Sequence, residues 1–199
     1  MEIYLYKMKS ELSEAQKIIL RLFREPLIRY NSRNISQEVG ISHAGAFKIL
    51  KKLADKDIVN PERIGRAVVY TLNKENPLSF REVEMALTIE AQEHRIWLEE
   101  FKSLENKSEF IILFGSILVN EKNARDIDLL VVANEDKFKE IKDILNERNK
   151  ILNKKIHLIL QEQKDFMLDL NNKKGVIWGA IKKGIVLFGQ EKISKMVIK

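Results

Sequence analysis

Cysteine is absent from the 199-residue chain, which excludes a disulfide framework and any metal site built on thiolates. Internal repeats and low-complexity tracts are also lacking, and no apolar run reaches the length that spans a membrane. Residues 1–7 lack the apolar core of a signal peptide. Together these absences predict an intracellular, cytoplasmic protein.

The composition of the chain indicates a globular protein with a net positive charge. Hydrophobic residues make up 45% of the chain and charged residues 32%, which is typical of folded sequence rather than disordered sequence. The net charge is +6, divided as +5 over residues 1–76, −3 over 77–104 and +4 over 105–199. This balance favours an anionic partner, either nucleic acid or nucleotide. The alternation of sign predicts two modules joined by an acidic connector.

The N-terminal part has the pattern of a helix-turn-helix. Amphipathic periodicity and capping signals predict helices over residues 13–24, 35–39 and 43–56. Ser13 and Ser42 are expected to cap the first and third helices, and Gly40 to end the second. In the third helix, Phe47, Leu50, Leu53 and Ala54 repeat at helical spacing and are expected in the core.

A predicted hairpin follows these helices. Residues 58–59 and 67–72 are expected to be its strands, with Gly65 at a tight turn. Three helices and a hairpin over about residues 10–75 resemble the winged helix-turn-helix domain of prokaryotic transcription regulators. The resemblance implies double-stranded DNA as a partner, read by the third helix and the hairpin. The side chains assigned to DNA are Ser42, His43, Lys48, Lys51, Lys52, Arg63 and Arg66. The alternatives are a solvated charged face or a protein-docking module, and the local charge of +5 favours DNA.

Pro77 is well placed to open a helix after the hairpin. The apolar pattern of residues 78–104 predicts one long, uninterrupted helix, since neither glycine nor proline breaks it. A helix of this length between two modules commonly packs against a second copy as well, so we expect a homodimer that would match a palindromic operator.

Two apolar runs in the C-terminal part carry the most informative motif. Residues 109–114 lead into Gly115 and Ser116, and the second run, 127–133, follows two aspartates, Asp126 and Asp128. A glycine turn lets the backbone approach a phosphate closely. Carboxylates at i and i+2 of a strand share one face. This combination suits phosphoryl transfer assisted by Mg²⁺.

The order and spacing of these residues resemble the Gly-Ser…Asp-x-Asp signature of polymerase-beta-like nucleotidyltransferases, in particular their minimal members. The resemblance implies that Gly115 and Ser116 bind the phosphates of ATP or another nucleoside triphosphate. It also implies that Asp126 and Asp128 hold Mg²⁺ and act in catalysis.

The family's third carboxylate is not found at the expected strand, residues 155–160. Alternation there places Ile156, Leu158 and Leu160 on one face and His157 on the other. His157 is therefore the third candidate catalytic residue, either as a base or as a histidine in a site that has lost its second metal. Glu162 is the nearest acid that could compensate.

The predicted fold class is α+β: a winged helix-turn-helix over residues 1–76, a linker and dimerisation helix over 77–104, and a nucleotidyltransferase-like α/β domain with a mixed sheet over 105–199. The expected function is a DNA-binding transcription regulator whose second domain binds nucleoside triphosphate and Mg²⁺, with weak or lost turnover. The alternatives are an active Mg²⁺-dependent nucleotidyltransferase that modifies a protein partner, and a non-catalytic interaction protein of the antitoxin type.

Overall fold

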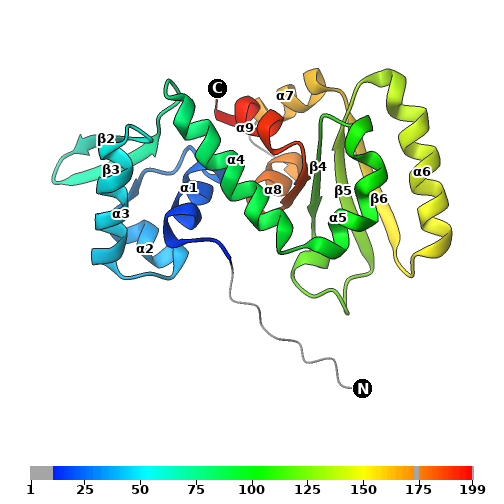
Figure 1. Ribbon diagram of the computed structural model, residues 1–199, viewed down its shortest axis with the longest axis horizontal. Coiled ribbons are helices and arrows are strands. Elements are labelled where there is room, and N and C mark those ends of the chain that lie inside the picture. The colour runs from blue at the N-terminus through cyan, green and yellow to red at the C-terminus, as the bar shows by residue number, and fades with distance from the viewer. Residues whose placement is uncertain (1–10, 173–174, 199) are drawn as a thin grey trace.

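The computed structural model describes residues 11–172 and 175–198. Figure 1 shows the winged-helix part at one end of the molecule and helix α6 at the other, with α4 running between them. The α+β fold class is confirmed, because helices and a small antiparallel sheet are followed by a mixed four-stranded sheet. None of the described helices is both long and apolar enough to cross a membrane.

Capping residues fix the three N-terminal helices, which are α1 (Glu14–Arg24), α2 (Ser32–Val39) and α3 (His43–Asp55). Ser13 and Gln16 bond reciprocally at the start of α1, and the Ser42 hydroxyl accepts a hydrogen bond from the Gly45 amide at the start of α3. Gly40 ends α2 with φ of +71°, a backbone conformation that favours glycine. Both predicted serine caps and the predicted glycine stop are confirmed.

A three-stranded antiparallel sheet completes the winged helix. Its strands are β1 (Tyr30–Asn31), β2 (Val59–Ile64) and β3 (Ala67–Leu72), in the order β1-β3-β2. Ile64 pairs with Ala67, so Gly65 and Arg66 form the two-residue turn, with φ of +59° at the glycine. The sequence did not predict β1, because a two-residue strand has no periodicity to detect.

One core assignment is wrong. Phe47 is 50% exposed, whereas Ala46, Leu50 and Leu53 on the same helix are buried. The buried stripe of α3 is thus centred on Ala46 and Leu50, and Phe47 lies beside it on the open face. Helical spacing alone accommodates either choice, because residues 46 and 47 lie four and three positions before Leu50, and both spacings share a helix face.

The connector is not one helix. It comprises α4 (Pro77–Gln92), α5 (Arg95–Phe101) and a 3-10 helix, η1 (Lys102–Lys107). Helix α4 ends before His94, whose φ of −114° and ψ of 41° are not helical. The predicted uninterrupted helix over 78–104 is therefore wrong.

The break has a packing reason. Val83 and Leu87 of α4 belong to the hydrophobic cluster on one face of the C-terminal sheet, whereas Phe101 and Leu104 belong to the cluster on the other face. A straight helix cannot bury one stripe on both faces of a sheet, so the chain turns between the two groups.

The C-terminal sheet contains β4 (Phe110–Phe114), β5 (Asp126–Val132), β6 (Lys155–Gln161) and β7 (Ile185–Phe188). Its order is β6-β5-β4-β7, with β5 and β6 parallel and the other pairs antiparallel. The 3-10 helix η3 (Glu135–Lys137) and helix α6 (Phe138–Ile151) form the crossover between the two parallel strands.

Helices cover both faces of this sheet. One face packs on α5, η1 and α6 through residues such as Phe101 and Ile141. The other face packs on α7 (Gln163–Asn172), α8 (Gly175–Lys183) and α9 (Gln190–Ile198), and its cluster continues without interruption into the winged helix.

Charged groups join the two parts across α4 and α8. Arg24 of α1 donates two hydrogen bonds to the carboxylate of Glu90 on α4, at 2.9 and 2.5 Å, and a third to the carbonyl of Gly184. The side chains of Arg24 and Glu90 are only 14% and 11% exposed. Glu25, the next residue, pairs with Lys182 of α8 at 2.9 Å.

Glu25 is held as a carboxylate by its neighbours. Burial by itself raises its pKa, but hydrogen bonds from Tyr30 and Lys182 and the charge of Arg21 outweigh burial and leave the pKa below its usual value. Burial and the hydrogen bond to Glu25 raise the pKa of Tyr30 to about 12. The Tyr30 hydroxyl therefore remains a donor to this junction at neutral pH.

Candidate functional site

Gly115 brings the backbone at the end of β4 directly against a carboxylate of β5. The preceding residue, Phe114, pairs with Asp128, and Gly115 itself has φ of +85°. A Cβ atom at this position would lie 1.9 Å from Asp128 Oδ2. Only glycine fits, since any other side chain would collide with Asp128 and adopt an unfavourable backbone conformation.

Asp126 and Asp128 stand on one face of β5, as predicted. Their side chains are 29% and 26% exposed, whereas Ile127 between them is buried on the opposite face. The two carboxylates therefore project beside the Gly115 turn at the edge where β5 begins. Arg125, just before them, is exposed.

His157 joins the two aspartates because β5 and β6 run parallel. Asp128 and His157 are register partners, and His157 Nδ1 lies 3.2 Å from Asp126 Oδ2 and 3.6 Å from Asp128 Oδ1. One ligand atom from each of the three side chains lies within 4.8 Å of the others. Across residues 11–172 and 175–198, this is the one group of three such side chains with this geometry.

The electrostatics of the group favour a cation. Burial raises the pKa of the Asp128 carboxyl, and the charge of Asp126 raises it further, while His157 partly offsets both effects. Two carboxylates held this close repel each other, and a positive charge between them would relieve the repulsion. The arrangement is thus suited to binding a metal ion.

Ser116 and Glu162 have different positions relative to this group. Ser116 is exposed and opens the 3-10 helix η2 (Ser116–Leu118) directly after Gly115. Glu162 follows the far end of β6, about 16 Å along the strand from His157 at the usual rise per residue, and it pairs with Lys164. Glu162 is therefore too distant to supply the missing third carboxylate.

One contact near the site was not predicted. The ammonium of Lys154 donates a hydrogen bond to the carbonyl of Ala124 at 2.5 Å. This bond ties the chain before β6 to the loop that leads into Asp126. No sequence signal identifies it, because the two residues are thirty positions apart.

The side chains assigned to DNA are all exposed, but they do not form one group. Lys48 and Lys51 share the open face of α3 with Phe47, whereas Lys52 lines a hollow of about 470 Å³ beside α1. Ser42 caps α3, and His43 Nε2 lies 2.9 Å from the Ser32 hydroxyl.

The two wing arginines are also exposed. Arg63 and Arg66 lie at the tip of the β2–β3 hairpin, where Arg63 Nε donates to the Gly65 carbonyl at 3.4 Å. Lys48 and Lys51 thus lie on the exposed face of α3 and the two arginines at the wing tip, and Lys52 is set apart from them.

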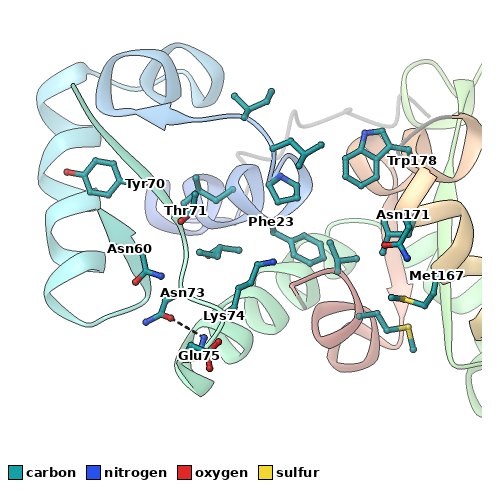
Figure 2. A pocket seen from close by; sticks show the side chains of 18 residues that line it. Phe23, Asn60, Tyr70, Thr71, Asn73, Lys74, Glu75, Met167, Asn171 and Trp178 are labelled. Carbon is teal, nitrogen blue, oxygen red and sulfur yellow. Dashed lines mark hydrogen bonds between the residues drawn. The ribbon is translucent and has the colours of Figure 1, made fainter. Parts of the chain in front are cut away.

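A larger cavity of about 550 Å³ lies between the winged helix and the C-terminal helices. Figure 2 shows Trp178, Asn171 and Met167 on one side of it and Tyr70, Thr71 and Lys74 on the other. None of the Gly115, Asp126, Asp128 or His157 side chains lines this cavity. It is a feature of the junction between the two parts and is separate from the carboxylate group.

A comparison with curated proteins finds no match for this chain. Among solved structures, a point mutant of Lactococcus lactis ZitR is 28% identical over 53% of this chain and 69% of that chain, with a TM-score of 0.32. Wild-type ZitR in complex with DNA is 26% identical over the same shares, with a TM-score of 0.31. Scores of this size do not establish a common fold, so the winged helix is assigned from this chain's own elements.

The family comparison concerns the C-terminal part. Residues 98–193 match the family model described as "Polymerase beta, Nucleotidyltransferase". This span contains the Gly115 turn, both aspartates of β5 and His157 of β6. The C-terminal part of the chain is therefore similar to the polymerase beta nucleotidyltransferases.

Proposed function

We propose that this protein is a DNA-binding regulator whose C-terminal domain binds a nucleoside triphosphate together with a divalent metal ion. The observation that carries the proposal is the fit of Gly115 against Asp128, which leaves no room for a side chain. A turn kept this close to a carboxylate lets a phosphate approach the backbone and the metal ligands at once.

The residues present fit Mg²⁺ as the family uses it. Mg²⁺ is usually held by one or two carboxylates together with substrate phosphates and water, and Asp126 and Asp128 supply the two carboxylates. Bound there, the ion would neutralise charge on the β- and γ-phosphates. Gly115 and Ser116 would hold the phosphates, and Asp126 and Asp128 would orient the ion.

His157 argues for binding over rapid turnover. It stands where the family resemblance implies a third carboxylate, and Glu162 cannot replace that carboxylate from its position at the other end of β6. The proposal is therefore a nucleotide-binding regulator. Transfer of a nucleotidyl group to a protein acceptor would instead make the chain an enzyme, and incubation with labelled nucleotide would detect that transfer.

Calorimetry with ATP and GTP, with and without Mg²⁺, tests the nucleotide site. We expect Mg²⁺-dependent nucleotide binding by the wild type. In the Asp126→Asn/Asp128→Asn variant the nucleotide affinity should fall by about 100-fold or more, because asparagine keeps the shape of aspartate but removes the negative charge of both metal ligands. Asp143→Asn, an exposed aspartate of α6, is the matched control and should bind as the wild type does. Labelled nucleotide incubated with the same samples detects transfer. Equal binding by the double variant and the wild type would overturn the proposal.

The proposed DNA binding rests on the exposed basic side chains of the winged helix. Lys48 and Lys51 lie on the open face of α3, and Arg63 and Arg66 lie at the wing tip. With a net charge of +5 over residues 1–76, this end of the molecule is suited to phosphate contacts. Lys52, on the flank beside α1, is not included among these contacts.

The salt dependence of DNA affinity tests the phosphate contacts proposed for Lys48 and Lys51. Each phosphate contact contributes about 0.9 to the slope of log K against log salt, so Lys48→Ala/Lys51→Ala should lower the slope by about 2. Fluorescence anisotropy with double-stranded DNA over a salt series measures this slope. Lys142→Ala, on the distant helix α6, should leave the slope unchanged (Figure 1). An unchanged slope in the double variant would show that α3 does not face the phosphates.

The homodimer stays a prediction. Helix α4 packs against α1, α9 and β7 of its own chain, so its buried stripe is already occupied. Leu78 and Met85 remain exposed on the same helix. Any contact between two copies through α4 would therefore use this smaller outer surface.

A further inference from the structure

His157 cannot move to the opposite face of β6 without disturbing the sheet. Ile156 is buried and Leu158 is partly buried in the cluster beneath the opposite face of β6. Because side chains alternate along a strand, burying these two residues fixes His157 on the Asp126 and Asp128 face. The parallel pairing of β5 with β6 then makes His157 the direct neighbour of Asp128.

The three side chains converge on a space suited to one ion. Two ligands on the same ion at bonds of about 2.1 Å are at most about 4.2 Å apart, and the ligand atoms of Asp126, Asp128 and His157 all lie within 4.8 Å of one another. Small side-chain rotations close that difference. The His157 side chain is 62% exposed, so an ion can enter from solvent and displace the contact between Nδ1 and Asp126.

An imidazole changes which ion such a group prefers. Mg²⁺ takes oxygen ligands, whereas imidazole suits Zn²⁺, Ni²⁺ and related first-row ions. Affinity for the same nitrogen and oxygen ligands also rises along the first-row series. Two carboxylates alone would leave Mg²⁺ competitive, but a nitrogen as third ligand favours the transition metals.

We infer that Asp126, Asp128 and His157 form a single-ion site that binds a first-row transition-metal dication more tightly than Mg²⁺. This inference rests on the metal site of the proposed function and adds to it the identity of the ion. His157 is a metal ligand in this site, and its imidazole sets the selectivity between ions.

Calorimetric titration of the full chain with Zn²⁺ and with Mg²⁺, without nucleotide, tests the selectivity. We expect one Zn²⁺ per chain at this site, bound at least 100-fold more tightly than Mg²⁺. His157→Ala should weaken Zn²⁺ at least tenfold with little change in Mg²⁺. His157→Asp should strengthen Mg²⁺ and reduce the Zn²⁺ preference. His94→Ala removes a histidine outside this group and should leave the metal site intact.

Co²⁺ substitution adds a readout that does not depend on affinity. The visible absorption of bound Co²⁺ should change between wild type and His157→Asp, because a nitrogen ligand is replaced by oxygen. Equal affinity for Zn²⁺ and Mg²⁺, or Zn²⁺ binding that His157→Ala leaves unchanged, would overturn the inference.

The nucleotide titration distinguishes this failure from failure of the proposed function. If selectivity is absent but Mg²⁺-dependent ATP binding persists, the nucleotide site stands and the role of His157 is wrong. If nucleotide binds with none of these ions while Zn²⁺ binds selectively, the metal site stands and the proposed function is wrong.

Discussion

Replacing Gly115 with alanine should lower metal-dependent nucleotide affinity by about 10–100-fold, the range observed when a group that positions a metal ligand is changed. The new Cβ would lie 1.9 Å from Asp128 Oδ2, so the carboxylate or the β4 turn must move. Residue 115 would also keep a φ of +85°, which costs about 1–2 kcal/mol for a residue with a side chain. Calorimetry with ATP and metal measures the loss, and circular dichroism checks that the domain remains folded.

Gly179→Ala is the matched control for this substitution. Gly179 lies on α8, and a Cβ there meets no heavy atom within 4 Å. Alanine is the better helix former, so this variant should be as stable as the wild type or more so, by about 0.5–1 kcal/mol. Wild-type nucleotide affinity in Gly115→Ala would mean that phosphates do not approach this turn.

Replacing Arg24 with methionine should destabilise the whole chain by about 3–5 kcal/mol, the range observed when one partner of a buried ion pair is removed. Glu90 would lose its charged partner at 11% side-chain exposure, and the Gly184 carbonyl would lose its hydrogen bond from Arg24. Urea unfolding followed by circular dichroism measures the change in the free energy of unfolding.

Two further variants test whether the unpaired Glu90 causes the destabilisation expected in Arg24→Met. Arg24→Met/Glu90→Leu removes both charges and should recover most of the loss, because an apolar pair can replace a buried ion pair. Arg81→Met breaks an exposed pair with Glu84 on the same helix α4 and should leave the unfolding midpoint unchanged. If the double variant is no more stable than Arg24→Met, the uncompensated charge of Glu90 is not the cause.

Local signals in the sequence predicted much of the fold. Ser13 and Ser42 cap helices where the sequence placed them, and the i, i+2 spacing of Asp126 and Asp128 correctly predicted that they share one face of a strand. These features depend on residues within a few positions of each other. That is the range over which capping and strand alternation act.

Features that depend on distant parts of the chain were not predictable in the same way. The end of α4 at Gln92 follows from the need to pack on two faces of a sheet that begins only at Phe110. The exposure of Phe47 follows from the position of α1 and α2 against α3. For such features, the sequence records the apolar residues and tertiary packing decides which of them are buried.

The candidate site illustrates the same division. His157 was identified as the third candidate from alternation along its own strand, but its distance to Asp126 depends on parallel pairing across a crossover helix. The separation of Glu162 from the site likewise required the length of β6. The candidate ligands could be identified from the sequence, whereas the distances between their ligand atoms depend on the assembled sheet.

The hydrophobic cluster that runs from the winged helix into the C-terminal sheet has a thermodynamic consequence. Its members include Ile18 and Phe23 at one end and Ile193 and Val197 at the other, with Val83 and Leu87 of α4 between them. Regions that share one core melt together, so calorimetric heating should show one cooperative transition for the full chain. A cut after residue 76 would expose apolar surface on both fragments. The winged helix and the C-terminal domain thus form one folding unit, and a substitution that unfolds one should unfold the other.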